Sequence, residues 1–552
     1  MRIERLSAFD LTNLAVEAAD TPMHVGVIAM VDGCGLLDAA GRPRLAAIHA
    51  RLRAGVCGAP RLRQVVYRPG LLAGRPIWVD DPGFRVERHV AAVAVEAPGG
   101  EAELLRLTER LLAAPLDRAR PLWYLWIVTG LPDHRVAVVV QLHHAVGDGA
   151  AAVRLLGALL DPPSAAEAPW APAPPPPWRQ LVVERLRGIR RARPGTGRSR
   201  GPGSGTARTA LGAEPAKDAA GPAMGADGLA MGRAEPTLRG AGPAKGGAEP
   251  ARGRAGPTMG RAGSTLGGAW QTLRRAWAAP RTSLNGPIGV GRRLGVVRLD
   301  LAEAKTVAHA AGGKANDVLL TVVAGGLREL LLARGEPVSG LELRVAVTVA
   351  LHAADGPASG RDGSAGGPEE PAGGADGPAG GRDEPASGKA ELAGGPAELA
   401  GGRDGAAGGN HNGSVVVRLP VGDADPRARL RAVAAETARA KRGQAAVAQQ
   451  GFMVAVARTG LARRLSRSQH LVNLVVSNVP GPPAPVRVLG APAIELVPVG
   501  ALAGNLAISF LALSYAGRLV VTAIADRARF PDLPVVLAGM ERDWAALTGA
   551  HH

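Results

Sequence analysis

The sequence predicts an α/β protein of two domains, and three observations carry that prediction. Apolar residues recur with the spacing of helices and strands in residues 1–161 and again in residues 283–552. Between these segments, residues 162–282 are rich in proline, glycine and alanine. A chain of 552 residues with 46% hydrophobic residues can also bury more than one core.

The first predicted domain, residues 1–161, contains a strand, a turn and a helix in close succession. Residues Arg135–Leu142 are mostly apolar and β-branched, which is typical of a buried strand. A helical pattern from Ala150 to Leu160 begins soon afterwards. We therefore expect the residues between these two elements, which include two histidines, to lie at the end of a strand.

Residues 162–282 are expected to form a largely disordered linker. Residues 193–265 repeat short phrases of Gly, Ala, Pro and Arg, which bury too little apolar surface to offset the entropy of ordering. Residues 162–290 contain 19 Lys and Arg against 7 Asp and Glu, so this segment carries +12 of the chain's net +17. Because it lacks aromatics interleaved for base stacking, nucleic acid binding is disfavoured, and the charge is expected to serve an anionic lipid surface or solubility.

The second predicted domain, residues 283–552, is interrupted by an acidic insertion at residues 351–409. The insertion contains 4 Lys and Arg against 10 Asp and Glu and has no period that could form a core face, so we expect it to be disordered. The flanking residues predict helices at Leu301–Ala311, Asp317–Leu332 and Pro426–Lys441, and strands at Gly413–Pro420, Leu471–Val476, Leu506–Ser514 and Leu519–Ile524.

The sequence predicts a cytoplasmic protein that contacts membranes only peripherally. Its two cysteines, Cys34 and Cys57, cannot form a disulfide framework for a chain of this length. The first residues lack the apolar run of a signal peptide. The longest strongly apolar stretches also fall well short of the roughly 20 residues that span a bilayer.

The predicted strand ends in His143 and His144, followed by Asp148 and Gly149. Side chains alternate across a strand, so the two histidines should face opposite sides, which disfavours a metal site that uses both. No third ligand follows at a suitable spacing, so no metal is expected. A histidine there, with a carboxylate one turn away, suits a general base, although His144 could be a core histidine and Asp148 a helix cap.

The pattern His-His-x-x-x-Asp-Gly is the signature of the CoA-dependent acyltransferase superfamily, and further segments resemble its wax ester synthase/diacylglycerol acyltransferase family. These further segments occur in both predicted domains. They are Leu6–Asp10, Pro22–Gly26, Pro115–Asp117 and Pro121-Leu122-Trp123 in the first, and Leu284–Pro287, Asn316-Asp317, Leu419-Pro420, Asn478–Pro482 and Ser514–Gly517 in the second.

The resemblance implies two domains, each with a mixed sheet and helices, and an active site in a tunnel between them. It implies transfer of a long acyl chain from acyl-CoA, a co-substrate, to diacylglycerol or a long-chain alcohol, with no bound cofactor. His144 would be the general base and Asp148 would orient the turn. His143, Gly149, Pro121-Leu122-Trp123 and Asn316-Asp317 would support the site, although Pro121 could equally start a strand and Asn316 could cap the helix that begins at Asp317.

Three other functions are weighed against this one. Residues Gly197–Gly201 satisfy the G-x-S-x-G pattern of serine hydrolases, but they lie in the predicted linker, without the required strand and helix. A condensation-like enzyme that acylates an amine or a carrier-bound substrate shares the histidine motif but not the Pro-Leu-Trp and Asn-Asp pairs. A non-catalytic protein of lipid surfaces would keep the histidines only for packing.

The acyltransferase is expected to associate with a membrane or a lipid body.

Overall fold

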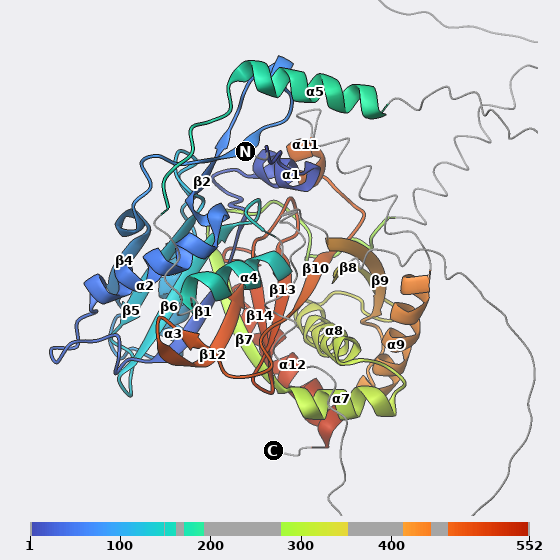
Figure 1. The fold of residues 1–552 in the computed structure, drawn as a ribbon. Helices are drawn as coiled ribbons and strands as arrows, with labels where there is room; N and C mark the ends of the chain where they lie inside the picture. The colour runs from blue at the N-terminus through green and yellow to red at the C-terminus, as the bar shows by residue number, and fades with distance from the viewer. Residues whose placement is uncertain are drawn as a thin grey trace, which may run out of the picture. The chain divides into compact units, whose positions relative to one another are not determined.

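The computed structural model describes residues 3–147, 149–161, 170–192, 278–350, 412–442 and 462–549 (Figure 1). Asp148, the Gly197–Gly201 motif and the two stretches predicted to be disordered, residues 193–265 and 351–409, lie outside these residues. The chain divides into two compact units, and both predicted domains contribute to the first of them, Met1–Arg185 with Ala276–His552. The second unit is Leu186–Arg275. The domain boundaries themselves stay a prediction.

The first sheet of the larger unit has six strands in the order β11-β12-β1-β6-β5-β4. Its β4 and β5 are parallel and its other neighbours are antiparallel, so the sheet is mixed. Its strands are β1 (His24–Asp32), β4 (Val90–Ala94), β5 (Trp123–Thr129), β6 (Arg135–His143), β11 (Arg487–Val488) and β12 (Ala491–Val499).

The second sheet also has six strands, in the order β7-β14-β13-β10-β8-β9. Here β10 is parallel to both β8 and β13, and the remaining pairs are antiparallel. Its strands are β7 (Arg292–Asp300), β8 (Glu342–Ala350), β9 (Asn412–Pro420), β10 (Leu474–Pro480), β13 (Ile508–Tyr515) and β14 (Arg518–Asp526). A small third sheet pairs β2 (Gln64–Tyr67) with β3 (Ile77–Asp80).

The first sheet is built from both ends of the chain. Strand β12 pairs with β1 along most of its length, so the orange-red strand lies beside the blue one in Figure 1. The alternation of side chains then divides the core in two. Ile28 and Val139 face a cluster that includes the second sheet, whereas Val27 and Val140 belong to a separate cluster on the other face.

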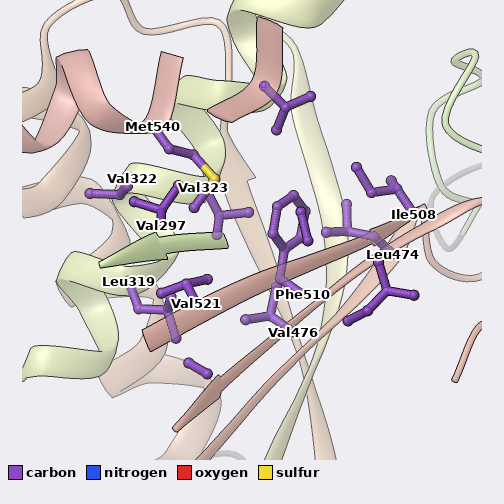
Figure 2. Close-up of a cluster of buried hydrophobic side chains, with 14 of the residues drawn as sticks. Val297, Leu319, Val322, Val323, Leu474, Val476, Ile508, Phe510, Val521 and Met540 are labelled. Carbon is purple, nitrogen blue, oxygen red and sulfur yellow. The ribbon is translucent and has the colours of Figure 1, made fainter. Parts of the chain in front are cut away.

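Helices flank the sheets, and two of them meet closely. Glycines at Gly326 of α8 and Gly539 of α12 allow that approach, since a Cβ on Gly539 would lie 2.9 Å from the Gly326 Cα. Figure 2 shows the core under these helices, in which Leu319 and Met540 lie near Phe510 of the second sheet. The helices are α1 (Ala8–Val16), α2 (Leu45–Gly58), α3 (Glu101–Leu111), α4 (Gly149–Leu160), α5 (Trp178–Ala192), α7 (Leu301–Ala310), α8 (Ala315–Ala333), α9 (Pro426–Arg442), α11 (Ala462–Arg467) and α12 (Leu533–Thr548), with short 3-10 turns η1 (Pro60–Arg63), η2 (Leu71–Ala73) and η3 (Val86–His89).

A buried carboxylate joins the early and late parts of the chain. Glu109 of α3 accepts the Leu294 N–H at 2.7 Å and the Arg527 guanidinium at 2.6 Å. Burial raises the pKa of the Glu109 carboxyl, although both contacts favour its charged form. The two predicted domains are therefore held together by polar contacts as well as by the shared sheet.

The strands and helices predicted from the sequence are confirmed, with shifted ends. Strand β10 begins at Leu474 rather than at Leu471. The reason is the Gln469 side chain, whose Oε1 accepts the N–H groups of Leu471 at 2.8 Å and Val472 at 3.1 Å. These residues form a turn before the strand. Within the described residues, every helix is too short or too polar to cross a bilayer.

Gly26 is expected to tolerate no side chain. A Cβ at this position would lie 2.0 Å from the Val140 carbonyl oxygen on the paired strand β6. Gly26→Ala should therefore lower the free energy of unfolding by about 1–3 kcal/mol, measured by denaturant titration. Gly35→Ala is the matched control, because a Cβ there meets nothing within 4 Å. Equal stability of the two variants would contradict the close approach of the strands.

Candidate active site

The histidine motif lies where β6 leaves the first sheet. His143 is the last residue of the strand and pairs with His24 at the start of β1. Its N–H donates to the Leu122 carbonyl oxygen at 3.0 Å, and the N–H of His144 donates to the Met23 carbonyl oxygen at 2.8 Å. The backbone of the motif is thus fixed on two sides before α4 begins at Gly149.

The His143 side chain is fully buried and has a neighbour at each ring nitrogen. The Ala145 N–H donates to its Nδ1 at 3.0 Å, so the ring proton is on Nε2. This Nε2 lies 3.3 Å from Oε1 of Glu17. The geometry at that second contact falls short of a well-formed hydrogen bond, so the attraction between His143 and Glu17 is chiefly electrostatic.

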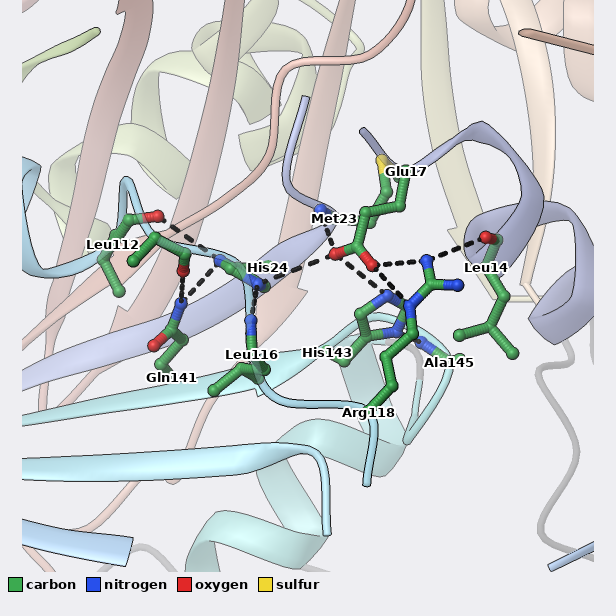
Figure 3. A network of polar contacts seen from close by, with 11 residues as sticks. Leu14, Glu17, Met23, His24, Leu112, Leu116, Arg118, Gln141, His143 and Ala145 are labelled. Atoms are coloured by element: carbon green, nitrogen blue, oxygen red, sulfur yellow. Dashed lines mark hydrogen bonds and ion pairs between the residues drawn. The ribbon is translucent and has the colours of Figure 1, made fainter. Parts of the chain in front are cut away.

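Glu17 connects His143 to the rest of the site (Figure 3). Its carboxylate accepts the Met23 N–H at 3.2 Å and two hydrogen bonds from the Arg118 guanidinium, at 2.6 and 3.1 Å. Burial by itself raises the pKa of this carboxyl, but the contacts with His143, Arg118 and Met23 together lower it to about 2. Glu17 is therefore a buried anion at neutral pH.

His24 extends this network along the first sheet. The Gln141 Nε2 lies 2.5 Å from its Nδ1, and Oε1 of Glu17 lies 3.7 Å from its Nε2. Burial lowers the pKa of His24 to about 4, against the opposing effect of the Glu17 charge. A cavity of about 20 Å³ adjoins His24 and is also lined by Leu294 and Val499 from the C-terminal part of the chain.

His144 lies in a different environment from His143. It follows the strand, in a turn, and its side chain is half-buried. Its ring meets that of Phe9 edge to face, with 5.7 Å between centroids. The two adjacent imidazoles therefore contact different partners.

The Pro121-Leu122-Trp123 segment supports the motif through backbone and packing contacts. Besides accepting from the His143 N–H, Leu122 belongs to a buried cluster with Ala145 from the histidine turn. Trp123 is buried in the first sheet's core, where its Nε1 donates to the Leu62 carbonyl oxygen at 2.6 Å and its ring stacks on His89. Pro121 lies two residues before β5, which begins at Trp123, so it does not start the strand.

Asn316 does not cap α8 as the sequence suggested. The helix begins at Ala315 with Lys314 at the N-cap position, and Oδ2 of Asp317, the third helical residue, accepts the Lys314 N–H at 2.7 Å. The other Asp317 oxygen accepts the Thr437 hydroxyl at 2.7 Å. Asn316 lies inside the first turn of the helix, and its amide oxygen accepts from Asn478 Nδ2 at 3.3 Å. The two family segments around Asn316 and Asn478 are thereby brought together.

Glu17 and Arg118 are the site residues that sequence reasoning missed. They lie 101 positions apart, and neither belongs to a segment singled out for its chemistry. His24, in contrast, stands within the recognised Pro22–Gly26 segment, and its pairing with the histidine strand could have marked it. In the part of the chain that the structure describes, no group of three His, Cys, Asp or Glu side chains is arranged to hold a metal ion.

The comparisons with known proteins agree with the resemblance seen in the motifs. Residues 6–319 match the family model described as the wax ester synthase/diacylglycerol acyltransferase catalytic domain, and residues 408–548 match the WS/DGAT C-terminal domain. The wax ester synthase/diacylglycerol acyltransferase from Marinobacter aquaeolei VT8 has a similar fold, with a TM-score of 0.56 at 20% identity over 99% of this chain and 98% of that one.

Two relatives from Mycobacterium tuberculosis are named as probable diacylglycerol O-acyltransferases. The protein tgs1 is 28% identical over 98% of this chain and 94% of its own length. The protein tgs3 is 33% identical over 33% of this chain and 66% of its own length. Because the catalytic-domain model alone covers more than half of the sequence, the chain belongs to the wax ester synthase/diacylglycerol acyltransferase family.

Proposed function

We propose that this enzyme transfers a long acyl chain from acyl-CoA to the hydroxyl group of diacylglycerol or of a long-chain alcohol. Its family membership supports the reaction class, and one observation supports the choice of base. His143 is buried, with Nδ1 occupied by the Ala145 N–H and Nε2 directed at Glu17, whereas His144 is half-buried in the turn. His144 is then the histidine that a substrate hydroxyl would meet.

The chemistry needs a base more than it needs a nucleophile. The hydroxyl oxygen attacks the thioester carbonyl, and His144 removes the hydroxyl proton as the new C–O bond forms. The tetrahedral intermediate then collapses, the C–S bond breaks, and His144 returns the proton to the departing sulfur. Thiolate is a good leaving group because the pKa of a thiol is about 8.5, and general base catalysis of this kind contributes about 10²–10⁴-fold.

The remaining motif residues are proposed to act on His144 through the backbone. His143, held by Glu17, fixes the end of β6, and Leu122 accepts the His143 N–H. Asp148 is proposed to orient the turn that carries His144. Gly149 is proposed to let α4 begin directly after that turn. Asn316 and Asp317 are proposed to support the site, and the contact of Asn316 with Asn478 agrees with that role.

An acceptor assay tests this function. Purified full-length protein would be incubated with labelled palmitoyl-CoA and, in separate reactions, with diacylglycerol, hexadecanol and a long-chain amine. We expect labelled triacylglycerol or wax ester and no amide. Product with the amine alone would favour a condensation-like activity, and product with none of the three would refute the proposal.

Asp148→Asn separates an orienting charge from a helix cap. Asparagine caps a helix about as well as aspartate, so a capping role alone predicts little change. If the charge orients the histidine turn, turnover should fall by at least about tenfold at every pH while the melting temperature stays near that of the wild type. Full activity of the variant would show that Asp148 acts only as a helix cap. Recovery of activity at high pH would indicate that Asp148 relays a proton.

The enzyme is further proposed to work at a lipid surface as a peripheral protein of the cytoplasm. Both acceptors partition into lipid, so the site must meet them there. The net charge of +12 in residues 162–290 is complementary to anionic headgroups.

A further inference from the structure

Helix α1 (Ala8–Val16) is tied at both ends to the histidine motif. Near its start, the Phe9 ring meets the His144 ring edge to face, with 5.7 Å between the centroids. At its end, Glu17 is the C-cap residue, and its Oε1 lies 3.3 Å from Nε2 of His143 (Figure 3). One short helix and its cap therefore contact both imidazoles of the motif, although they lie more than 120 positions earlier in the chain.

The start of α1 is held in place by contacts other than the ring pair. The Ser7 hydroxyl oxygen accepts the Asp10 N–H at 3.1 Å, and Asp10 Oδ2 accepts the Ser7 N–H at 2.8 Å, which together form a capping box. Leu6 is fully buried and packs in a cluster with Ala145, the residue after the second histidine. Phe9, two residues after the cap, therefore extends from a fixed helix start.

The His144 side chain stands in a turn and is half-buried, so neither a helix nor a strand restricts its rotamer. A side chain has three staggered positions about χ1, and a histidine ring has two broad orientations about χ2. A histidine that sampled all of these equally would be aligned with a substrate hydroxyl about one sixth of the time. An aromatic pair of the observed geometry favours one arrangement by a factor of about 2–10, which is the size of this difference.

We propose that Phe9 is a positioning residue, whose ring holds the His144 imidazole in the orientation that accepts the substrate proton. Phe9 acts through His144 and not on the substrate. The orientation of the base matters while the proton moves and not while substrate binds, so the ring pair contributes to kcat and leaves KM unchanged. The inference rests on the proposed function, because it takes His144 to be the base. It gives a role to the Leu6–Asp10 segment, for which the family resemblance supplied none.

The first test compares three single substitutions in the full-length protein, assayed with palmitoyl-CoA and the acceptor that the wild type prefers. Phe9→Leu keeps an apolar side chain but removes the ring, so kcat should fall about 3–10-fold with both KM values within about twofold of the wild type. Phe9→Tyr keeps the ring and should keep kcat within about twofold. Phe84→Leu, the matched control, should do the same, because Phe84 is also half-buried and its ring lies 5.4 Å from that of His89, away from the motif.

The second test asks whether Phe9 acts through His144. When Phe9→Leu is added to His144→Ala, the residual turnover should stay within about twofold, since no imidazole remains to be positioned. A role in stability alone would lower turnover by the same factor in both backgrounds. Denaturant titration measures the contact without turnover. The effects of Phe9→Leu and His144→Ala on the unfolding equilibrium should be non-additive by a factor of about 2–10, whereas those of Phe84→Leu and His144→Ala should combine within about twofold.

The inference is overturned if Phe9→Leu turns over like the wild type, if Phe9→Tyr loses as much turnover as Phe9→Leu, or if Phe9→Leu has the same effect with and without His144. Unfolding equilibria without coupling between Phe9 and His144 would overturn it as well. Failure of the proposed function looks different. A wild type that transfers no acyl group refutes the general base and the positioning role together, whereas normal turnover of Phe9→Leu beside an inactive His144→Ala removes only the role of Phe9.

Discussion

Replacing His144 by alanine is expected to lower turnover at least about 10²-fold while the protein stays folded. The loss follows from the acceptor chemistry, because an alcohol hydroxyl hardly ionises at neutral pH and needs a base as it attacks. The side chain is half-buried in a turn, and the backbone N–H that bonds to Met23 remains in the variant, so little packing is lost. Steady-state turnover and thermal unfolding would be measured on the same samples.

His143→Ala is the informative comparison for this variant. That substitution removes a fully buried ring, leaves the Ala145 N–H without its acceptor and exposes the Glu17 charge to an empty space. We therefore expect a clear drop in melting temperature for His143→Ala and little change for His144→Ala. A folded His144→Ala protein with normal turnover would refute the general base mechanism.

Most of the fold could be predicted from the sequence because its elements follow local patterns. The structure has a strand at β6 and helices at α4, α7, α8 and α9, where the spacing of apolar residues predicted them. The pairing of β12 with β1 could not be predicted. It joins residues more than 460 positions apart, and the sequence of neither strand identifies its partner. The start of α8 was missed for a local reason, because Asp317 sits at the third position of the helix and accepts the N–H of the N-cap residue Lys314, so the helix begins two residues before Asp317.

The candidate site was predictable only in part. His143 and His144 stand in a pattern that the chemistry constrains, so both could be singled out from the sequence. Their environments differ because His143 ends the strand and His144 lies in the turn after it. Glu17 and Arg118 carry no such pattern. They meet because the segment between α1 and β1 folds back over the end of β6, and only this tertiary contact turns an ordinary glutamate into a buried anion beside His143. Sequence spacing says nothing about a contact of that kind.

Glu17→Ala is expected to cost stability as well as turnover. The substitution removes the acceptor of the Arg118 and Met23 hydrogen bonds and the negative charge beside His143, at a site where the carboxyl is almost fully buried. Lowering the pKa of a carboxyl from 4.5 to about 2 corresponds to about 3 kcal/mol at neutral pH, and screening by solvent reduces this stabilisation of the folded state to about 2–3 kcal/mol. Turnover should fall too, because His143 then no longer fixes the end of β6 that presents His144.

The pH dependence of that stability loss distinguishes the charge of Glu17 from its packing. A carboxyl with a lowered pKa stabilises the fold at pH values above its ordinary pKa, and the contribution disappears as the pH falls toward its folded value of about 2. The difference in unfolding free energy between the wild type and Glu17→Gln, which keeps the size of the side chain, should therefore be largest at pH 6–7, by about 2–3 kcal/mol, and shrink below about pH 4. Glu96→Gln is the matched control, because Glu96 is 74% exposed and its ion pair with Arg110 should contribute less than about 1 kcal/mol. A difference between the wild type and Glu17→Gln that stays constant from pH 7 to pH 3 would show that the carboxylate acts by shape and hydrogen bonding rather than by charge.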